Sequence, residues 1–245
     1  LSPPPLWVIP EFIRSGDSEV LQSTYEDILF RDIVARYGIR DVTTFRQMAR
    51  YLFANFTEEA SYHSLKNALG IKSAMSARSF ARYLEEAYLV FELYNYQYSL
   101  KKQYTGTRKF FVVDNGMRNA VSLRFSGDRG RMLEDLVFIE LKRRGNPVYF
   151  WREDRECDFL VEKGGKPAEA IQCSCTIAGS SREREVAGVV AAMDRFGIDE
   201  GTIITYDQEG EVEAPGGKRV LLVPAWKWLI GASPSPGQQR DPGLP

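Results

Sequence analysis

The spacing of the apolar residues changes near residue 90, and no other feature of the sequence constrains the fold as much. Between residues 24 and 93, apolar residues recur three and four positions apart, which is the spacing of amphipathic helices. Beyond that point, short β-branched and aromatic runs lie between two longer helical stretches. The sequence therefore predicts an α/β chain, α+β overall, in which a helical domain precedes a domain built on a sheet.

Four helices are predicted in the first half, each marked by residues that begin or end helices. They are a helix capped by Thr24 and ended by Gly38, one over about residues 43–56, a short one from Ser61 to Gly70, and one over about residues 76–88. The second should turn five side chains into the core: Phe45, Met48, Ala49, Leu52 and Phe53. A short helix, a tight turn and a longer helix are typical of a helix-turn-helix.

A β-hairpin is predicted after these helices. Residues 90–98 and 109–113 are β-prone, and the polar segment between them contains Gly106, so the sequence predicts a winged-helix domain over residues 24–122. Polar and basic residues lie on the early turns of its last helix and at the ends of the hairpin: Arg78, Ser79, Arg82, Lys101, Lys102, Arg108 and Lys109. They are candidates for binding duplex DNA, with the helix in the major groove and the hairpin on phosphates. The alternative is a protein-docking module whose charges are merely solvated.

The second half predicts elements in the order α-β-β-β-α-β within a domain over residues 123–232. The helices cover about residues 130–144 and 180–196, and the strands cover about residues 147–152, 157–161, 168–176 and 201–206. Residues 233–245 are rich in Pro, Gly and Gln, and we expect this tail to be disordered.

Polar side chains interrupt the apolar faces of this second domain. Glu134 projects from the apolar stripe of its helix, where an unpaired charge is costly. By alternation, Asp158 shares one face of its strand with Glu156, and Gln172 shares a face of the next strand with Ser174. We therefore expect polar groups from one helix and two neighbouring strands to converge.

Two interpretations of this convergence stay open. Asp158, Glu134 and Gln172 offer two carboxylates and an amide oxygen, which together make a weak oxygen site for Mg²⁺. Alternatively, Glu134 pairs with a buried arginine such as Arg152, and Asp158 ends a turn. Spacing alone favours this second interpretation.

Four runs of the sequence carry a resemblance to a known family. They are YEDILFRDIV at residues 25–34, FSGDRGRMLE at 125–134, YFWR at 149–152 and ECDF at 156–159. In this order they resemble the C-terminal region of a widespread prokaryotic and archaeal family of AAA-type ATPases, over about residues 25–224. The resemblance implies a winged helix joined to a domain of unknown function related to the PD-(D/E)XK, restriction-endonuclease-like nucleases.

The same resemblance implies a catalytic set and its loss. In that superfamily a helix carboxylate, a strand Asp and a Glu-x-Lys on the next strand bind the metal and activate water. Matched residue by residue, this set falls on Glu134, Asp158, Gln172 and Ser174. Gln172 removes a negative charge from the metal shell, and Ser174 removes the cation that would act on water or the phosphate. The resemblance therefore implies a degenerate site, for which Mg²⁺ is the only cofactor the pattern suggests.

The ATPase half of such a protein is expected upstream. Residues 1–23 resemble a run-in from that domain, and the chain begins with Leu1 instead of Met, so we expect a fragment of a longer protein. A G-x-x-x-x-G-K-[ST] phosphate-binding loop is absent, because Gly164-Gly165-Lys166 lacks the first glycine and the following Ser or Thr. We therefore expect no ATP binding by this chain.

Composition limits the remaining possibilities. No run approaches the roughly 18 apolar residues of a membrane span, and no signal-peptide pattern opens the chain, so we expect a cytoplasmic protein without membrane contacts. Three cysteines and one histidine argue against a disulfide framework and a zinc site. A net charge of −1 argues against a general polyanion binder, so DNA contact requires a local basic patch.

Three hypotheses follow. The first is a DNA-interacting, catalytically degenerate module that works with an upstream ATPase domain or with other protomers. The second is an active Mg²⁺-dependent DNA nuclease. The third is a protein-docking or oligomerisation module without a nucleic-acid role.

Overall fold

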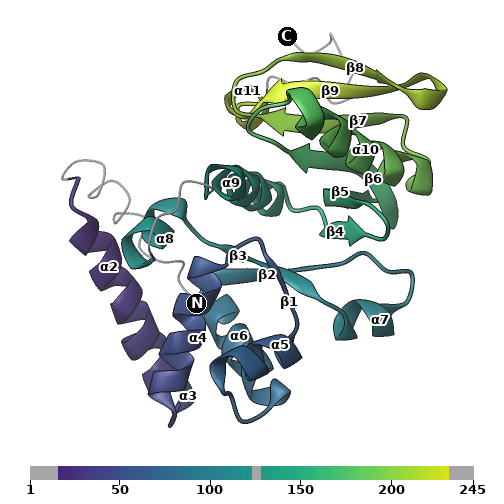
Figure 1. The fold of residues 1–245 in the computed structure, drawn as a ribbon. Helices are drawn as coiled ribbons and strands as arrows, with labels where there is room; N and C mark the ends of the chain where they lie inside the picture. Colours follow the sequence, from purple (N-terminus) through teal and green to yellow (C-terminus); the bar gives the residue numbers. More distant parts are fainter. Residues whose placement is uncertain (1–15, 123–127, 232–245) are drawn as a thin grey trace, which may run out of the picture. The chain divides into compact units, whose positions relative to one another are not determined.

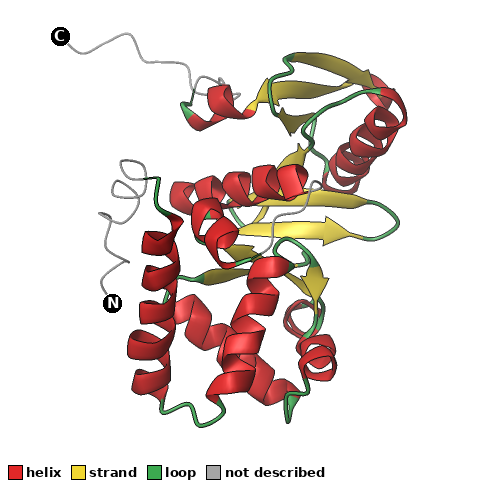
Figure 2. Cartoon of the chain, turned by 60° about the vertical axis from the view of Figure 1, so that its left-hand side comes forward, coloured by secondary structure: helices red, strands yellow, loops and turns green. Residues whose placement is uncertain are grey.

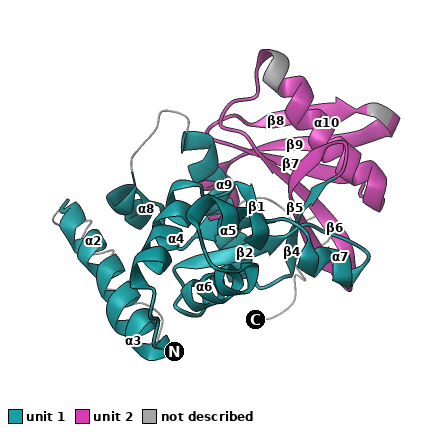
Figure 3. Cartoon of the chain, turned by 60° about the horizontal axis from the view of Figure 1, so that its bottom comes forward, with its two compact units in different colours: residues 1–152 teal, residues 153–245 magenta. Residues whose placement is uncertain are grey.

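The computed structural model of the chain describes residues 16–122 and 128–231. The chain divides into two compact units, residues 1–152 and 153–245 (Figure 3). This division follows residue 152, whereas the sequence predicted a boundary between residues 122 and 123. Most of the predicted run-in, residues 1–15, and the predicted disordered tail lie outside the described residues, as do residues 123–127.

A continuous helix opens the described part of unit 1. It begins as α2 (Ser18–Asp27), passes through the π-helical stretch η1 (Ile28–Val34) and ends as α3 (Ala35–Tyr37). The predicted cap at Thr24 is wrong, because the Asp17 carboxylate accepts the Glu19 amide at 2.9 Å and begins the helix there. Thr24 lies inside the helix, where its hydroxyl donates to the Val20 carbonyl at 2.7 Å. Gly38 ends the helix as predicted, at φ 59°.

Three further helices follow in the predicted order: α4 (Val42–Ala54), α5 (Tyr62–Leu69) and α6 (Ala74–Glu86). The side chains of Asp41, Ser61 and Ser73 accept backbone amides that the first turn of each helix leaves unpaired. The five α4 side chains predicted to face the core are all at most 2% exposed. These helices share one apolar core with the first helix.

A small antiparallel sheet packs in the same unit (Figure 2). It consists of β1 (Glu59–Ala60), β2 (Val90–Tyr94) and β3 (Arg108–Val112), in the order β1-β3-β2. β2 and β3 form the predicted antiparallel hairpin. The predicted polar loop between them contains a helix, α7 (Leu100–Thr105), whose first turn is capped by Ser99.

Three elements complete unit 1: α8 (Asn115–Val121), α9 (Asp128–Arg144) and β4 (Val148–Arg152). The Tyr96 amide donates to the Phe150 carbonyl at 2.7 Å, which ties β4 to the segment that follows β2. The helix and strand that the sequence assigned to a second domain are therefore part of this unit.

Unit 2 is a sheet covered by one long helix. Its strands are β5 (Glu156–Lys163), β6 (Lys166–Cys173), β7 (Glu200–Thr205), β8 (Gly210–Ala214) and β9 (Lys218–Pro224), in the order β5-β6-β7-β9-β8. α10 (Gly179–Phe196) packs on β5, β6 and β7 (Figure 1), the 3-10 turn η2 (Pro215–Gly217) joins β8 to β9, and α11 (Ala225–Leu229) follows β9. From α9 to β7 the elements follow the predicted order α-β-β-β-α-β.

Gly188 sets how closely α10 approaches the sheet. A Cβ at this position would lie 2.3 Å from the Glu156 carbonyl oxygen, which is far inside van der Waals contact. Only glycine therefore fits where α10 crosses β5. No helix in the described part of the chain combines the length and the apolar character that crossing a membrane requires.

Candidate functional site

Glu134, the helix carboxylate of the predicted catalytic set, is held in a buried ion pair. It lies on α9, and Nζ of Lys109 on β3 lies 2.8 Å from its Oε1. The Glu134 and Lys109 side chains are 12% and 6% exposed, so each charge is compensated by the other and not by water. One interpretation of the sequence expected a buried arginine such as Arg152 in this role. Arg152 is instead exposed and pairs with Glu59.

Asp135, the next residue on α9, was not predicted and is almost completely buried. Its Oδ1 accepts the Val112 amide at 2.8 Å. Within the described residues, no donor reaches its Oδ2. Burial raises the pKa of this carboxyl well above its usual value, and the Val112 amide offsets this only in part.

Asp158 and Gln172 lie beside each other on β5 and β6 of unit 2. The Asp158 amide donates to Oε1 of Gln172 at 3.1 Å, and the Cys173 amide donates to Oδ2 of Asp158 at 2.9 Å. Both side chains are buried, at 7% and 8% exposure. The side chains thus replace backbone hydrogen bonds of the ladder between the two strands.

Glu185 on α10 joins this pair and was missed in the sequence. Nε2 of Gln172 donates to its Oε2 at 2.9 Å, and the Arg184 guanidinium donates to its Oε1 at 2.6 Å. The Glu185 residue is 7% exposed. The result is a buried polar cluster of Asp158, Gln172 and Glu185, in which an amide connects two strands to the helix.

The sequence did contain a signal for Glu185. It precedes Gly188, Val189 and Ala192 by three, four and seven positions, and these three residues form the stripe of α10 that is buried against the sheet. The same pattern singled out Glu134 on its own helix. Applied to residues 179–196, it would have predicted a second helix carboxylate in an apolar stripe.

Ser174, another member of the predicted set, directs its hydroxyl to a backbone carbonyl. Ser174 follows the end of β6, and its hydroxyl donates to the Thr176 carbonyl at 3.2 Å. Glu134 belongs to unit 1, so its convergence with Asp158 and Gln172 stays a prediction. In residues 16–122 and 128–231, no group of three or more His, Cys, Asp or Glu side chains could hold a metal ion.

The predicted DNA contacts divide into exposed and buried groups. Arg78 and Arg82 on α6 are exposed, Ser79 is half-buried between them, and Lys101 and Lys102 on α7 are exposed. Arg82 lies 3.6 Å from Glu86 and remains 62% exposed. These five positions can be reached by a ligand from solvent.

Arg108 and Lys109 require a correction, because both are buried on β3. Arg108 lies 3.5 Å from the Glu92 carboxylate, and its guanidinium stacks 3.9 Å from the centre of the Tyr62 ring. Lys109 is the partner of Glu134. Their charges are neutralised inside the unit, so these side chains do not face phosphates.

A cleft of about 300 Å³ opens beside the first half of α6. Residues from the end of the first helix, from the turn before α4 and from α6 line it, among them Tyr37, Arg40, Lys72, Met75 and Ser76. Arg40 and Lys72 are exposed cations that the sequence analysis missed. They lie outside the regular helix and hairpin positions on which that analysis relied.

The first half of the chain matches a family model. Residues 8–128 match DUF8612, a domain of unknown function. An uncharacterized protein of the archaeon Methanocaldococcus jannaschii is 33% identical over 226 residues, which is 86% of this chain and 50% of that protein. An uncharacterized protein of the bacterium Haemophilus influenzae is 28% identical over 149 residues, which is 59% of this chain and 37% of that protein.

The chain therefore spans half of the archaeal relative's length, and less of the bacterial relative's. No solved structure matches the chain. The comparisons relate it to archaeal and bacterial proteins without assigning an activity to any of them.

Proposed function

We propose that this chain is a DNA-interacting module with a degenerate nuclease-like site, and that it acts with an ATPase domain of a longer protein. In this proposal residues 24–122 are a winged helix, and the α-β-β-β-α-β segment is related to the PD-(D/E)XK nucleases. The DNA role rests on the exposed cations around α6. The lost chemistry rests on the hydrogen bonds that occupy the polar groups around Asp158.

The exposed cations at the start of α6 carry the DNA part of the proposal. Lys72 and Arg78 are exposed, and among the described residues neither has an ion-pair partner. Arg40, which lines the same cleft, is also exposed and has no ion-pair partner among the described residues. Asp41, whose carboxylate caps α4, also lines this cleft, so the cations outnumber the carboxylates there by two to one. Exposed cations attract phosphates and release the counterions bound to them.

The other side chains on this surface also suit a groove of duplex DNA. Ser76 and Ser79 offer hydroxyls on the same part of α6, and Met75 is 66% exposed there. Hydroxyls can bind phosphates or base edges, and an apolar side chain can contact a thymine methyl group. The cleft is also lined by Tyr37, Ile39, Phe80 and Tyr83. We favour DNA over a docked protein because charged residues are depleted at the centre of protein-docking surfaces, whereas Arg40 and Lys72 lie in this cleft.

The carboxylates do not fit a Mg²⁺ site, which supports the degenerate part of the proposal. Mg²⁺ requires several oxygen ligands that are free to point at it. One oxygen of Asp158 accepts a backbone amide, the Gln172 oxygen accepts another, and the side-chain amide nitrogen of Gln172 donates to Glu185. Glu134 is paired with Lys109. We expect any Mg²⁺ binding to be weak and hydrolysis to be absent.

The ATPase part of the proposal comes from the resemblance of the four runs and from chain length. The archaeal relative is about twice as long as the region it shares with this chain, which leaves room for another domain. ATP binding belongs to that other domain, because this chain contains no phosphate-binding loop.

Two assays on the 245-residue chain test the proposal. Binding to a labelled DNA duplex should weaken about 10- to 100-fold between about 50 and 200 mM KCl, as expected for two to four phosphate contacts. Incubation of the duplex with Mg²⁺ or Mn²⁺ should give no cleavage. Cleavage that disappears in Asp158→Ala would establish the active-nuclease hypothesis instead. The lack of any binding at low salt would leave the docking hypothesis.

A further inference from the structure

The segment that joins β2 to β3, with α7 at its centre (Figure 1), carries an exposed surface that the proposed function does not use. Every residue from Tyr98 to Tyr104 is exposed except Gln103, which is buried. Tyr98 is 70% exposed and Tyr104 is 56% exposed, so two aromatic side chains are open to water. Large aromatic side chains that gather on a surface in this way indicate a binding site.

Two lysines lie between these tyrosines in the sequence. Lys101 precedes Tyr104 by three positions on α7, so the two side chains share one side of the helix. Lys101 and Lys102 are both exposed, and neither has an ion-pair partner in residues 16–122 and 128–231. We call Tyr98, Lys101, Lys102 and Tyr104 the tyrosine–lysine surface.

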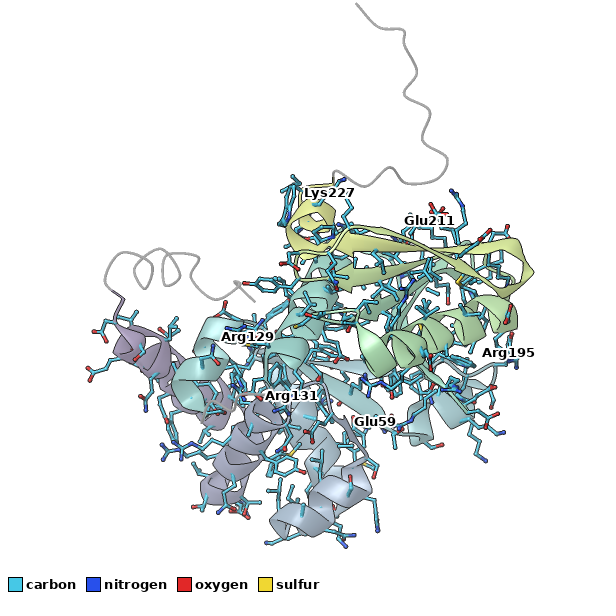
Figure 4. The ribbon with its side chains drawn as sticks, turned by 45° about the horizontal axis from the view of Figure 1, so that its top comes forward. Glu59, Arg129, Arg131, Arg195, Glu211 and Lys227 are labelled. Atoms are coloured by element: carbon cyan, nitrogen blue, oxygen red, sulfur yellow. The ribbon has the colours of Figure 1, made fainter. Side chains whose placement is uncertain are left out.

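The segment contains no carboxylate that would neutralise these lysines, because residues 93–113 include neither Asp nor Glu. Two carboxylates on β1 and β2 contact the segment, and both are occupied. Glu59, labelled in Figure 4, accepts the Thr107 hydroxyl at 2.8 Å and pairs with Arg152. The Glu92 side chain is buried inside the unit. The tyrosine–lysine surface is therefore cationic.

Hydrogen bonds at both ends hold α7 in place. At its start, the Ser99 hydroxyl accepts the Lys102 amide at 3.5 Å. At its end, the buried Arg108 guanidinium donates to the carbonyls of Tyr104 and Gly106 at 3.2 and 2.7 Å. A surface that is fixed before its ligand arrives loses less conformational freedom on binding. Arg108 thus positions the surface, although its own charge does not reach solvent.

We propose that the tyrosine–lysine surface binds single-stranded nucleic acid. Exposed tyrosine rings stack on unpaired bases, and ammonium groups beside them contact the phosphates of the same strand. In a duplex the bases are paired and stacked on one another, so their faces are closed to such rings. This site is separate from the α6 surface proposed for duplex DNA and does not require it.

Other partners fit this surface less well. Protein-docking surfaces are rich in tyrosine but depleted in lysine, and two of the four side chains that define this surface are lysines. A helix that lies on a membrane needs a broad apolar face, whereas Leu100 is the one aliphatic residue of α7. Paired aromatic rings and cations without carboxylates match the bases and phosphates of a single strand.

Fluorescence anisotropy of a labelled oligothymidylate of about 12 nucleotides tests the proposal on the 245-residue chain. The chain should bind this oligomer, and Tyr98→Ala and Tyr104→Ala should each weaken binding about 5- to 100-fold, because each removes a ring that stacks on a base. Tyr98→Phe and Tyr104→Phe keep the ring and should bind within about twofold of the natural chain. Circular dichroism of each variant shows whether it is folded.

Tyr206→Ala is the matched control. Tyr206 follows β7 in unit 2 and is 68% exposed, so the variant also removes an exposed ring, but one that is not part of the tyrosine–lysine surface. Its affinity for the oligothymidylate should equal that of the natural chain.

The charges and the bases of the strand are tested separately. Lys101→Ala and Lys102→Ala should each lower the slope of log affinity against log salt by about 0.7, the value for one phosphate contact of a single strand. An oligomer of abasic nucleotides keeps the phosphates but offers nothing for the tyrosines to stack on. It should bind at least about fivefold more weakly than the oligothymidylate of the same length.

Four outcomes would overturn the proposal. The first is a chain that does not bind the oligothymidylate at about 50 mM KCl, including one that binds phosphatidylserine vesicles instead. The second is folded Tyr98→Ala and Tyr104→Ala variants that both bind as the natural chain does. The third is an abasic oligomer that binds as tightly as the oligothymidylate. The fourth is a loss in Tyr98→Ala and Tyr104→Ala that is as large for duplex DNA as for the single strand.

These outcomes are distinguishable from a failure of the proposed function. Duplex binding is measured with Lys72→Ala and Arg78→Ala, which change the α6 surface and leave the tyrosine–lysine surface intact. A chain that binds duplex DNA through α6 but not the oligothymidylate would overturn only the inference about the single strand.

Discussion

The Lys109 ammonium lies 2.8 Å from the Glu134 carboxylate, and both side chains are buried. The sequence had assigned these residues to different tasks, Lys109 to phosphate binding and Glu134 to a metal site. In the structure they neutralise each other between β3 and α9. The pair therefore has a structural role, because it links α9 to β3 within unit 1.

Removal of Lys109 should destabilise the protein. Lys109→Met leaves Glu134 buried without its cation, which costs about 3–5 kcal/mol of unfolding free energy. Lys163→Met is the matched control, because the Lys163–Glu169 pair is largely exposed and screened by water, and should cost at most about 1 kcal/mol. Urea unfolding of both variants measures the difference. Equal costs would contradict a stabilising role for the buried pair.

The parts of the fold that depend on neighbouring residues were predicted from the sequence. α5 begins and ends where expected, because Ser61 and Gly70 act within one turn, whereas α4 ends at Ala54, two residues before the expected Phe56. Helix α7 was missed because Leu100 is the one aliphatic residue among its six, so no apolar spacing is visible and only its cap at Ser99 marks it. The burial of Arg108 and Lys109 depends on partners far along the chain, which alternation along one strand does not reveal.

Asp135 should make stability fall as pH rises above the usual range of carboxyl titration. The pKa of Asp135 is raised in the folded protein. Above about pH 4 this carboxyl therefore ionises in the unfolded chain while it stays protonated in the folded one, and the free energy of unfolding falls. Asp135→Asn removes this titration while keeping an acceptor for the Val112 amide. Urea unfolding at several pH values should show the variant gaining stability relative to the natural chain as pH rises. A constant difference across pH would disprove the burial of an ionisable group here.

Two helical glycines should respond to alanine in opposite directions. Gly188→Ala introduces a Cβ that lies 2.3 Å from the Glu156 carbonyl oxygen, so α10 must shift at a cost of about 1–3 kcal/mol. At Gly130 on α9 a Cβ would meet nothing within 4 Å, and Gly130→Ala should stabilise by about 0.5–1 kcal/mol through helix propensity. Thermal unfolding of both variants gives the two signs. A neutral Gly188→Ala would show that α10 does not cross β5 this closely.

The buried hydrogen bond between Gln172 and Glu185 in unit 2 should survive when the amide and the carboxylate exchange positions. It should not survive when both positions carry a carboxylate. Gln172→Glu removes the donor to Glu185 and should lower Tm by roughly 2–10 °C. Added Mg²⁺ should recover part of this loss, because the variant supplies the carboxylate expected of an intact metal site. The double variant Gln172→Glu/Glu185→Gln restores one donor and one acceptor and should recover the Tm without Mg²⁺. A single variant as stable as the natural chain would contradict the cluster.

The candidate site could be predicted in part for the same reason as the fold. Asp158 and Gln172 were identified because strand alternation places polar residues on one face. In the structure backbone amides of the two strands donate to the side-chain oxygens of both residues. Glu185 was missed although the spacing argument used for Glu134 applies to it. Arg40 and Lys72 were missed because a surface assembled from a turn and a helix start has no periodic pattern in the sequence.

The most direct test of the proposed function is duplex-DNA affinity as a function of salt for Lys72→Ala, Arg78→Ala and the charge-matched control Lys166→Ala. Each of the first two should weaken binding and lower the slope of log affinity against log salt by about 1, because each loses one phosphate contact. Lys166→Ala should leave both quantities unchanged, since Lys166 lies on the β5–β6 turn. Slopes for Lys72→Ala and Arg78→Ala equal to that of the natural chain would contradict DNA binding by α6.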